Sequence, residues 1–323
     1  MRHAITAISG LVLLAIMAIA GTIAFDRPGM PPALANISVP FQAVDLSDLP
    51  PISHVTARDG TDLAYRRYPG NPDRLVILIH GSAGSSIGMH ALAKALSDAG
   101  ATVITPDIRG HGQSGAHGDI AYIGQLEDDL DDLMTSLDKT HRASETTLIG
   151  FSSGGGFVLR IAGGRVGQRF DRFILLAPFL RHDAPNVRIG TASGGWVSVA
   201  VPRLLALSLI NRIGITMFNG LPVLAFAVAA SNPAHLTTTY SYRLSANFQP
   251  DDDYPADLRR NTRPIMAMGG ADDATFRSDR LQAALAIGKP DIRVDLVPGV
   301  GHIGLTTTPT GTTAIVKAWS SRF

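Results

Sequence analysis

Cysteine is absent from the 323 residues of this chain. Its absence excludes disulfides, thiolate metal sites, a cysteine nucleophile and a lipidated cysteine anchor, but leaves the redox compartment open. Charge is also sparse, since Asp, Glu, Lys and Arg make up 17% of the residues and give a formal net charge of +1. No cluster of Lys and Arg falls on one predicted face, so we expect no nucleic-acid partner.

Apolar residues, by contrast, make up 45% of the chain, and its length suits one large domain with an insertion. Buried apolar runs alternate with helical segments along most of residues 52–323. This alternation predicts an α/β fold, in which a mostly parallel, twisted sheet carries helices on both faces. An Asp59-Gly60 pair between two strand-like segments predicts an antiparallel hairpin at the start of this domain.

The first 25 residues form a separate segment. The run from Ala4 to Phe25 carries no charge, and at about 1.5 Å per residue it is long enough to cross a hydrocarbon core of roughly 30 Å. We expect residues 1–25 to be a transmembrane anchor, or a signal peptide cleaved near Ala18 and Ala20. Both alternatives place the protein at the membrane or outside the cytoplasm, in the periplasm if the source is bacterial.

Two further segments depart from the alternation of strands and helices. Residues 26–51 are rich in proline, which predicts an extended tether; the alternative is an arm that packs on the domain through residues such as Phe41. Residues of about 180–262 hold two apolar stretches interrupted by Pro202 and Pro222, too short and broken to predict membrane spans. We expect this helical insertion to be a lid whose inner face lines an acyl pocket, or else additional core.

The most informative stretch is an apolar run that ends in Gly150-Phe151-Ser152-Ser153-Gly154. This GxSxG pattern, followed by small residues that begin a helix, predicts a tight turn that lifts Ser152 clear of the backbone. A serine hydroxyl is a poor nucleophile by itself. It needs that exposure, a nearby base and hydrogen-bond donors for the oxyanion that forms when it attacks.

Candidates for the base and its acidic partner follow later strands, in the order that this topology requires. His302 lies on a glycine-flanked loop after the last predicted strand and is the candidate base. The acid is Asp273 or its neighbour Asp272, and we favour Asp273. His80 and His111 belong to turn motifs, for which a structural hydrogen bond is the preferred interpretation.

These motifs together resemble the α/β hydrolase superfamily. They are HGS at 80–82, DIRGHGQS at 107–114, GFSSG at 150–154, GGADD at 269–273 and GVGH at 299–302. The loop at 107–114 is most similar to the lysophospholipase, monoacylglycerol lipase and S33 peptidase-like branch. The resemblance covers residues 52–323 apart from the insertion. It implies a Ser152-Asp273-His302 triad, an oxyanion hole from the backbone N–H groups of Ser82 and Ser153, and no cofactor or metal.

The expected function is a serine hydrolase that cleaves carboxylic esters of lipophilic acyl groups through an acyl-enzyme. Dehalogenase and epoxide hydrolase chemistry needs an Asp at the position of Ser152, which argues against both. An S33-type aminopeptidase is the first alternative, although no acidic patch in the insertion clearly awaits a substrate amine. A non-catalytic binding protein on the same fold is the second. Oligomeric state does not follow from the sequence.

Overall fold

The structure is a computed structural model that describes residues 2–32, 34, 40–188, 195–228 and 236–322. Its main body is an eight-stranded sheet in the spatial order β1 (Ile52–Thr56), β2 (Asp62–Tyr68), β4 (Ala101–Pro106), β3 (Asn71–Ile79), β5 (Glu145–Phe151), β6 (Arg172–Leu176), β10 (Ile265–Gly270) and β11 (Arg293–Val297). From β4 to β11 neighbouring strands are parallel, whereas β2 pairs antiparallel with both β1 and β4. The predicted α/β fold and its starting hairpin are confirmed.

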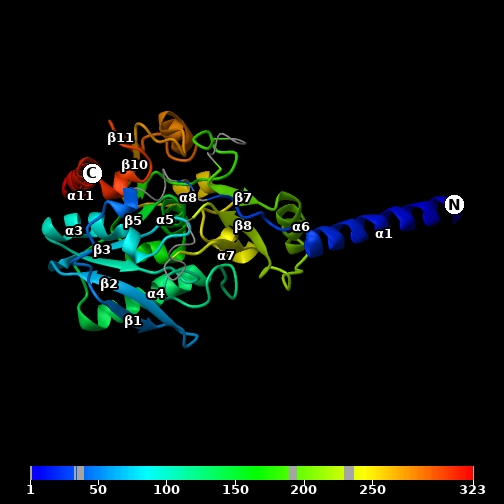
Figure 1. Cartoon of the computed structure of the whole chain (residues 1–323), viewed down its shortest axis with the longest axis horizontal. Helices are drawn as coiled ribbons and strands as arrows, with labels where there is room; N and C mark the ends of the chain where they lie inside the picture. The colour runs from blue at the N-terminus through cyan, green and yellow to red at the C-terminus, as the bar shows by residue number, and fades with distance from the viewer. Residues whose placement is uncertain (1, 33, 35–39, 189–194, 229–235, 323) are drawn as a thin grey trace.

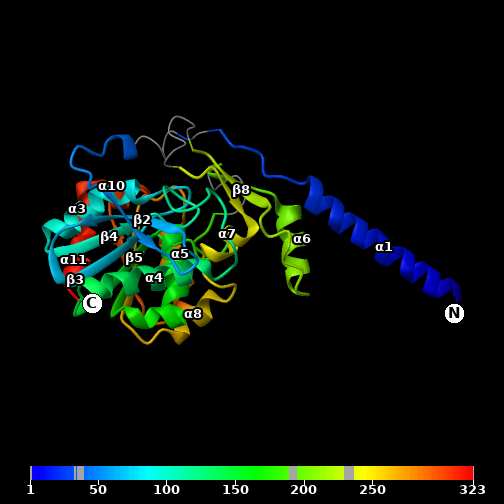
Figure 2. The same ribbon diagram turned by 90° about the horizontal axis from the view of Figure 1, so that it is seen from below.

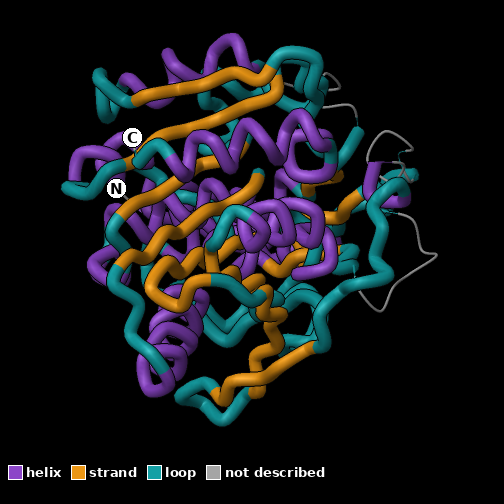
Figure 3. Tube along the Cα trace, turned by 90° about the vertical axis from the view of Figure 1, so that its left-hand side faces the viewer, coloured by secondary structure: helices purple, strands orange, loops and turns teal. Residues whose placement is uncertain are grey.

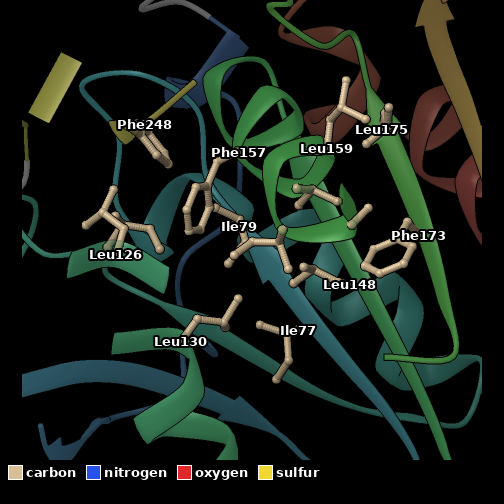
Figure 4. Packing of buried hydrophobic residues seen from close by; sticks show 14 of the residues in the cluster. Ile77, Ile79, Leu126, Leu130, Leu148, Phe157, Leu159, Phe173, Leu175 and Phe248 are labelled. Atoms are coloured by element: carbon tan, nitrogen blue, oxygen red, sulfur yellow. The ribbon is translucent and has the colours of Figure 1, made fainter. Parts of the chain in front are cut away.

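The central strand β3 shows why the sheet is covered on both faces. Its residues Leu75, Ile77 and Ile79 belong to one buried cluster, while the intervening Val76 and Leu78 belong to another. Successive side chains of a strand point to opposite faces, so an uninterrupted apolar run needs a helical layer on each side. Figure 4 shows the first cluster, in which Ile77 and Ile79 lie among side chains from the neighbouring strands and helices.

Two groups of helices supply these layers (Figure 3). The first cluster includes residues of α4 (Gln125–Thr140), α5 (Ser153–Gly163), α8 (Tyr254–Arg260) and α9 (Leu281–Ala286). The second includes residues of α3 (His90–Asp98), α10 (Gly304–Thr307) and α11 (Pro309–Ser320). Short 3-10 turns complete the body at η1 (Ser86–Met89), η2 (Arg165–Arg169) and η4 (Ser278–Arg280).

The insertion lies between β6 and β10, as expected, but it is not purely helical. Its described elements are β7 (Val197–Val199), α6 (Val201–Asn211), β8 (Pro222–Phe226), β9 (Thr239–Ser241), α7 (Tyr242–Asn247) and α8. The strands form a small antiparallel sheet in the order β7-β8-β9. The expectation of a helical insertion missed this sheet, because β7 and β9 span three residues each and are too short to show an alternating pattern.

The N-terminal helix α1 (Arg2–Phe25) projects from the body and meets the insertion at its C-terminal end (Figures 1 and 2). There the buried Ile23 packs with Leu207 of α6 and Val223 of β8, and the carboxylate of Asp26 accepts a hydrogen bond from the Arg203 N–H at 2.9 Å. Within the described part of the chain, no helix combines the length and apolar character needed to cross a membrane.

The segment predicted as a tether contacts the domain at several described points. Leu34 and Phe41 pack against the second buried cluster, and the Phe41 ring lies over Gly88. The carboxylate of Asp48 pairs with Lys94 and with His90 Nε2 at 3.0 Å. At these described positions the segment packs on the domain, as the alternative arm would, while residues 33 and 35–39 of the predicted tether lie outside the described part of the chain.

Candidate active site

Ser152 occupies the turn between β5 and α5 in a strained conformation. Its φ of 56° and ψ of −118° lie outside the regions that L-residues favour. The turn is held because the Ser152 N–H donates to the Leu176 carbonyl at 2.8 Å, and the Ser152 carbonyl accepts from Phe179 N–H at 3.0 Å. Strain of this kind at a chemically competent side chain is typical of functional sites.

The glycines of the GxSxG pattern are required by close backbone approach. A Cβ atom at Gly150 would lie 2.2 Å from the Gly154 carbonyl oxygen, and one at Gly154 would lie 2.3 Å from the His80 carbonyl oxygen. Neither distance is sterically possible without moving backbone. The two glycines are therefore needed because the backbones of β3, β5 and α5 approach one another closely at this point.

Three of the predicted site residues form a continuous hydrogen-bonded chain. His302 Nε2 lies 3.2 Å from Ser152 Oγ, and His302 Nδ1 lies 2.7 Å from Asp273 Oδ2. The other carboxylate oxygen of Asp273 accepts from the N–H groups of Thr275 and Phe276 at 2.7 and 2.9 Å. With Asp273 accepting from Nδ1–H, His302 Nε2 is left as an acceptor for the serine proton. The competing candidate, Asp272, is exposed.

The chain is shielded from solvent. Ser152, His302 and Asp273 are 9%, 8% and 5% exposed. Burial raises the pKa of Asp273, but its hydrogen bonds to His302 and to backbone N–H groups outweigh that effect, so its pKa falls below the usual range. The ring of Phe276 contacts His302 edge-on, with ring centroids 5.0 Å apart, and Phe151 lies against it with ring centroids 4.8 Å apart. The imidazole therefore works in a largely apolar environment.

The two predicted oxyanion residues also meet at the site. Ser82 follows the end of β3 and Ser153 begins α5, and their hydroxyl groups are hydrogen-bonded to each other. Ser82 belongs to a tight turn in which the Gly84 N–H donates to the Gly81 carbonyl at 3.2 Å. The next residue, Ala83, has a φ of 59°, in the left-handed region that favours glycine.

The remaining motif histidines are buried and hydrogen-bonded at both ring nitrogens. His80 Nε2 accepts from the Ile108 N–H at 3.1 Å and its Nδ1 donates to the Gly81 carbonyl at 2.8 Å. His111 Nδ1 lies within 3.3 Å of backbone carbonyls, and its Nε2 is 2.5 Å from the hydroxyl of Tyr240. Burial lowers the pKa of both histidines, which keeps both rings neutral. Through these bonds, His80 connects its turn to the loop after β4, and His111 connects that loop to the insertion.

The sequence did not predict the hydrogen bond between Tyr240 and His111. Tyr240 comes from the insertion, and no motif or periodicity surrounds it in the sequence Thr-Thr-Thr-Tyr-Ser-Tyr.

Among the described residues, no group of three or more His, Cys, Asp or Glu side chains is arranged to hold a metal ion. A cavity of about 250 Å³ is lined by residues of 162–168 and 260–263 and does not include Ser152, Asp273 or His302.

The mostly parallel sheet and the strained serine turn are those of an α/β hydrolase. The sequence profile described as serine aminopeptidase, S33, matches residues 70–305, and the chain belongs to this family. A stretch of 122 residues is 34% identical to the non-heme chloroperoxidase CPO-A1 of Kitasatospora aureofaciens. That match covers 38% of this chain and 42% of the relative, so it spans less than half of that protein.

Solved structures agree on the fold. The chain is similar to the monoacylglycerol lipase of Paleococcus ferrophilus, with a TM-score of 0.59 and 18% identity over 81% of this chain and 99% of that chain. It is also similar to a soluble variant of the monoglyceride lipase from Saccharomyces cerevisiae, with a TM-score of 0.60 and 18% identity over 84% and 94% of the two chains. The predicted membership of the α/β hydrolase superfamily and its S33-type family is confirmed by the family match, and these solved structures agree with the predicted fold.

Proposed function

We propose that this α/β hydrolase is a serine esterase that cleaves esters of lipophilic acyl groups through an acyl-enzyme on Ser152. The observation that carries the proposal is the hydrogen-bonded chain from Ser152 Oγ through His302 to Asp273. Each member comes from a different strand end, and Ser152 is held in a strained turn. A nucleophile, a base and a group that orients the base are the parts that acyl transfer requires.

In the proposed reaction, His302 Nε2 accepts the proton of Ser152 as the serine oxygen attacks the ester carbonyl carbon. The backbone N–H groups of Ser82 and Ser153 donate to the oxyanion that forms. Collapse breaks the bond to the leaving alcohol, which takes its proton from His302. Water, activated by the same imidazole, then attacks the acyl-enzyme and releases the acid.

Two observations support a lipophilic acyl group. The imidazole of His302 lies against the rings of Phe151 and Phe276, so the reacting bond would enter apolar surroundings. Two solved structures with the same fold are named as a monoacylglycerol lipase and a monoglyceride lipase. Excluding water from such a site strengthens each electrostatic interaction within it.

Aminopeptidase activity is the alternative that the family name suggests. A peptide amino terminus would need an unpaired carboxylate near the site. In the insertion, Asp183, Asp251, Asp253 and Asp257 each form an ion pair with an arginine. Asp252, the remaining acidic residue of the insertion, is exposed, and the four pairs leave little other acidic charge for a substrate amine, which favours an ester substrate over a peptide.

The test combines covalent labelling with turnover on the full-length chain. A fluorophosphonate probe should label Ser152, identified by mass spectrometry of the modified peptide, because an unactivated serine does not react. Hydrolysis of p-nitrophenyl esters should rise from acetyl to long acyl chains and disappear in Ser152→Ala. Activity confined to short esters would contradict the lipophilic class. Absence of both labelling and Ser152-dependent hydrolysis would overturn the serine mechanism.

A further inference from the structure

The turn that carries Ser82 contains a residue in an unfavourable conformation. Gly81 to Gly84 form a four-residue turn closed by a hydrogen bond, with Ser82 and Ala83 at its centre. Ala83 has a φ of 59°, whereas Ser82 is not among the residues with positive φ. This combination is that of a type II turn, whose third position ordinarily holds glycine or asparagine. Ala83 therefore needs contacts from outside the turn to stay in this conformation.

Both backbone groups of Ala83 are held by the insertion. The Ala83 N–H donates to the hydroxyl of Tyr240 at 2.8 Å, and the Ala83 carbonyl accepts from the Thr237 N–H at 3.0 Å. The hydroxyl of Thr237 also donates to the Gly110 carbonyl at 2.9 Å. The bond from the Ala83 N–H to Tyr240 fixes the peptide between Ser82 and Ala83, whose orientation distinguishes a type II turn from a type I turn, and the bond from Thr237 fixes the peptide that follows.

The Tyr240 hydroxyl is itself fixed. Tyr240 is 2% exposed, and it donates to His111 Nε2 while accepting from the Ala83 N–H, so both of its hydrogen-bonding roles are used. His111 is anchored in turn to the backbone carbonyls of Ile108 and Arg109. The phenol ring packs separately, against Phe226 and Phe248, with ring centroids 4.6 and 6.5 Å away. Ring packing and hydroxyl bonding can therefore be tested apart.

We propose that Tyr240 is a positioning residue for the oxyanion hole. Its hydroxyl holds Ala83 in the left-handed conformation and thereby orients the turn that presents the Ser82 N–H. The inference rests on the proposed serine esterase function and on Ser82 as an oxyanion donor. Tyr240 does not touch the reacting atoms; it acts through the backbone of its neighbour.

Tyr240→Phe is the direct test, because it keeps the buried ring and removes only the hydroxyl. The Ala83 N–H then loses its acceptor, and the turn is free to leave the type II conformation. We expect kcat on the best ester of the series to fall about 10- to 100-fold with KM within about twofold, since an oxyanion donor acts in the transition state. The inhibition constant of an alkylboronic acid, which forms a tetrahedral adduct with an active serine, should rise by a similar factor.

Tyr242→Phe is the matched control, because among the described residues its hydroxyl bonds only Ser208 Oγ, at 3.2 Å, within the insertion. Its kcat should stay within about twofold of the wild-type value. Adding Ala83→Gly to Tyr240→Phe should raise kcat several-fold, since glycine adopts positive φ without steric cost. Such a rescue separates turn geometry from general loss of folding.

Three outcomes would overturn the inference: equal kcat for the two phenylalanine variants, an unchanged boronate inhibition constant, or no rescue by Ala83→Gly. Fluorophosphonate labelling of Ser152 is measured in the same preparations, so that failure of this inference can be told apart from failure of the proposed function. If Ser152 is labelled and required for hydrolysis, such an outcome refutes the role of Tyr240 alone. If Ser152→Ala remains active, the proposed function itself has failed.

Discussion

Asp273→Asn provides the sharpest test of the proposed triad, because the structure dictates how the new amide must lie. One oxygen of Asp273 accepts two backbone N–H groups, from Thr275 and Phe276. The amide oxygen of asparagine must keep that place, so its NH₂ group takes the position of Oδ2 and faces His302 Nδ1, 2.7 Å away. Two donors cannot share that bond, so the imidazole proton moves to Nε2.

With its proton on Nε2, His302 no longer accepts from Ser152 Oγ. The expected loss is on the order of 10⁴ in kcat, or roughly 5 kcal/mol of activation free energy, by analogy with the wrong-tautomer variant of the serine proteases. The assay is steady-state hydrolysis of the best p-nitrophenyl ester, with thermal unfolding to verify that the variant is folded.

Asp272→Asn is the matched control. Asp272 is the adjacent residue and its side chain is exposed, so kcat should stay within about twofold of the wild-type value. Small and equal losses in the two variants would refute the tautomer argument, and a large loss in Asp272→Asn alone would transfer the role of the acid to that residue.

Further predictions concern the serine turn and the carboxyl group of Asp257 on α8. Gly154→Ala should reduce the free energy of unfolding by about 1–3 kcal/mol or more and abolish fluorophosphonate labelling of Ser152, because its Cβ would lie 2.3 Å from the His80 carbonyl oxygen. Gly304→Ala is the control: its Cβ would have no atom nearer than 3.4 Å, so stability and labelling should be unchanged. Burial and the charge of Asp251 raise the pKa of Asp257 to about 7, against the opposing effect of Arg260. A carboxyl group with a raised folded-state pKa contributes stability that is fully present below its unfolded pKa of about 4 and is lost as pH rises towards 7. Urea unfolding across this window should show that loss for the wild type and a flatter profile for Asp257→Asn, and parallel profiles would contradict the reasoning.

Sequence patterns predicted the parts of the fold that depend on local chemistry. The apolar run 75–79 predicted a strand covered on both faces, and Asp59-Gly60 predicted the β1–β2 hairpin. The GxSxG pattern predicted the strained turn at Ser152, because its glycines are demanded by sterics that any member of this fold shares.

The remainder depends on contacts between residues distant in sequence. Asp272 and Asp273 are adjacent and chemically identical, so the sequence does not separate their roles. The loop after β10 buries Asp273 beside His302 and leaves Asp272 exposed. Strands β7 and β9 are too short to show the alternation of apolar and polar residues that predicts a strand. Tyr240 bonds Ala83 across 157 positions, and a single tyrosine gives no local signal of that partnership.

The way the insertion returns through Thr237 and Tyr240 limits how it can be exchanged between proteins. A recombinant chimera that replaced residues 180–262 as a block would exchange the whole insertion and, in the same step, remove the hydrogen bonds that Tyr240 and Thr237 make to Ala83. A crossover placed before residue 237 would keep that support with the recipient. The part that remains interchangeable is centred on α6, which packs chiefly on α1 and β8. In this hydrolase the insertion is partly a module and partly a structural component of the catalytic domain.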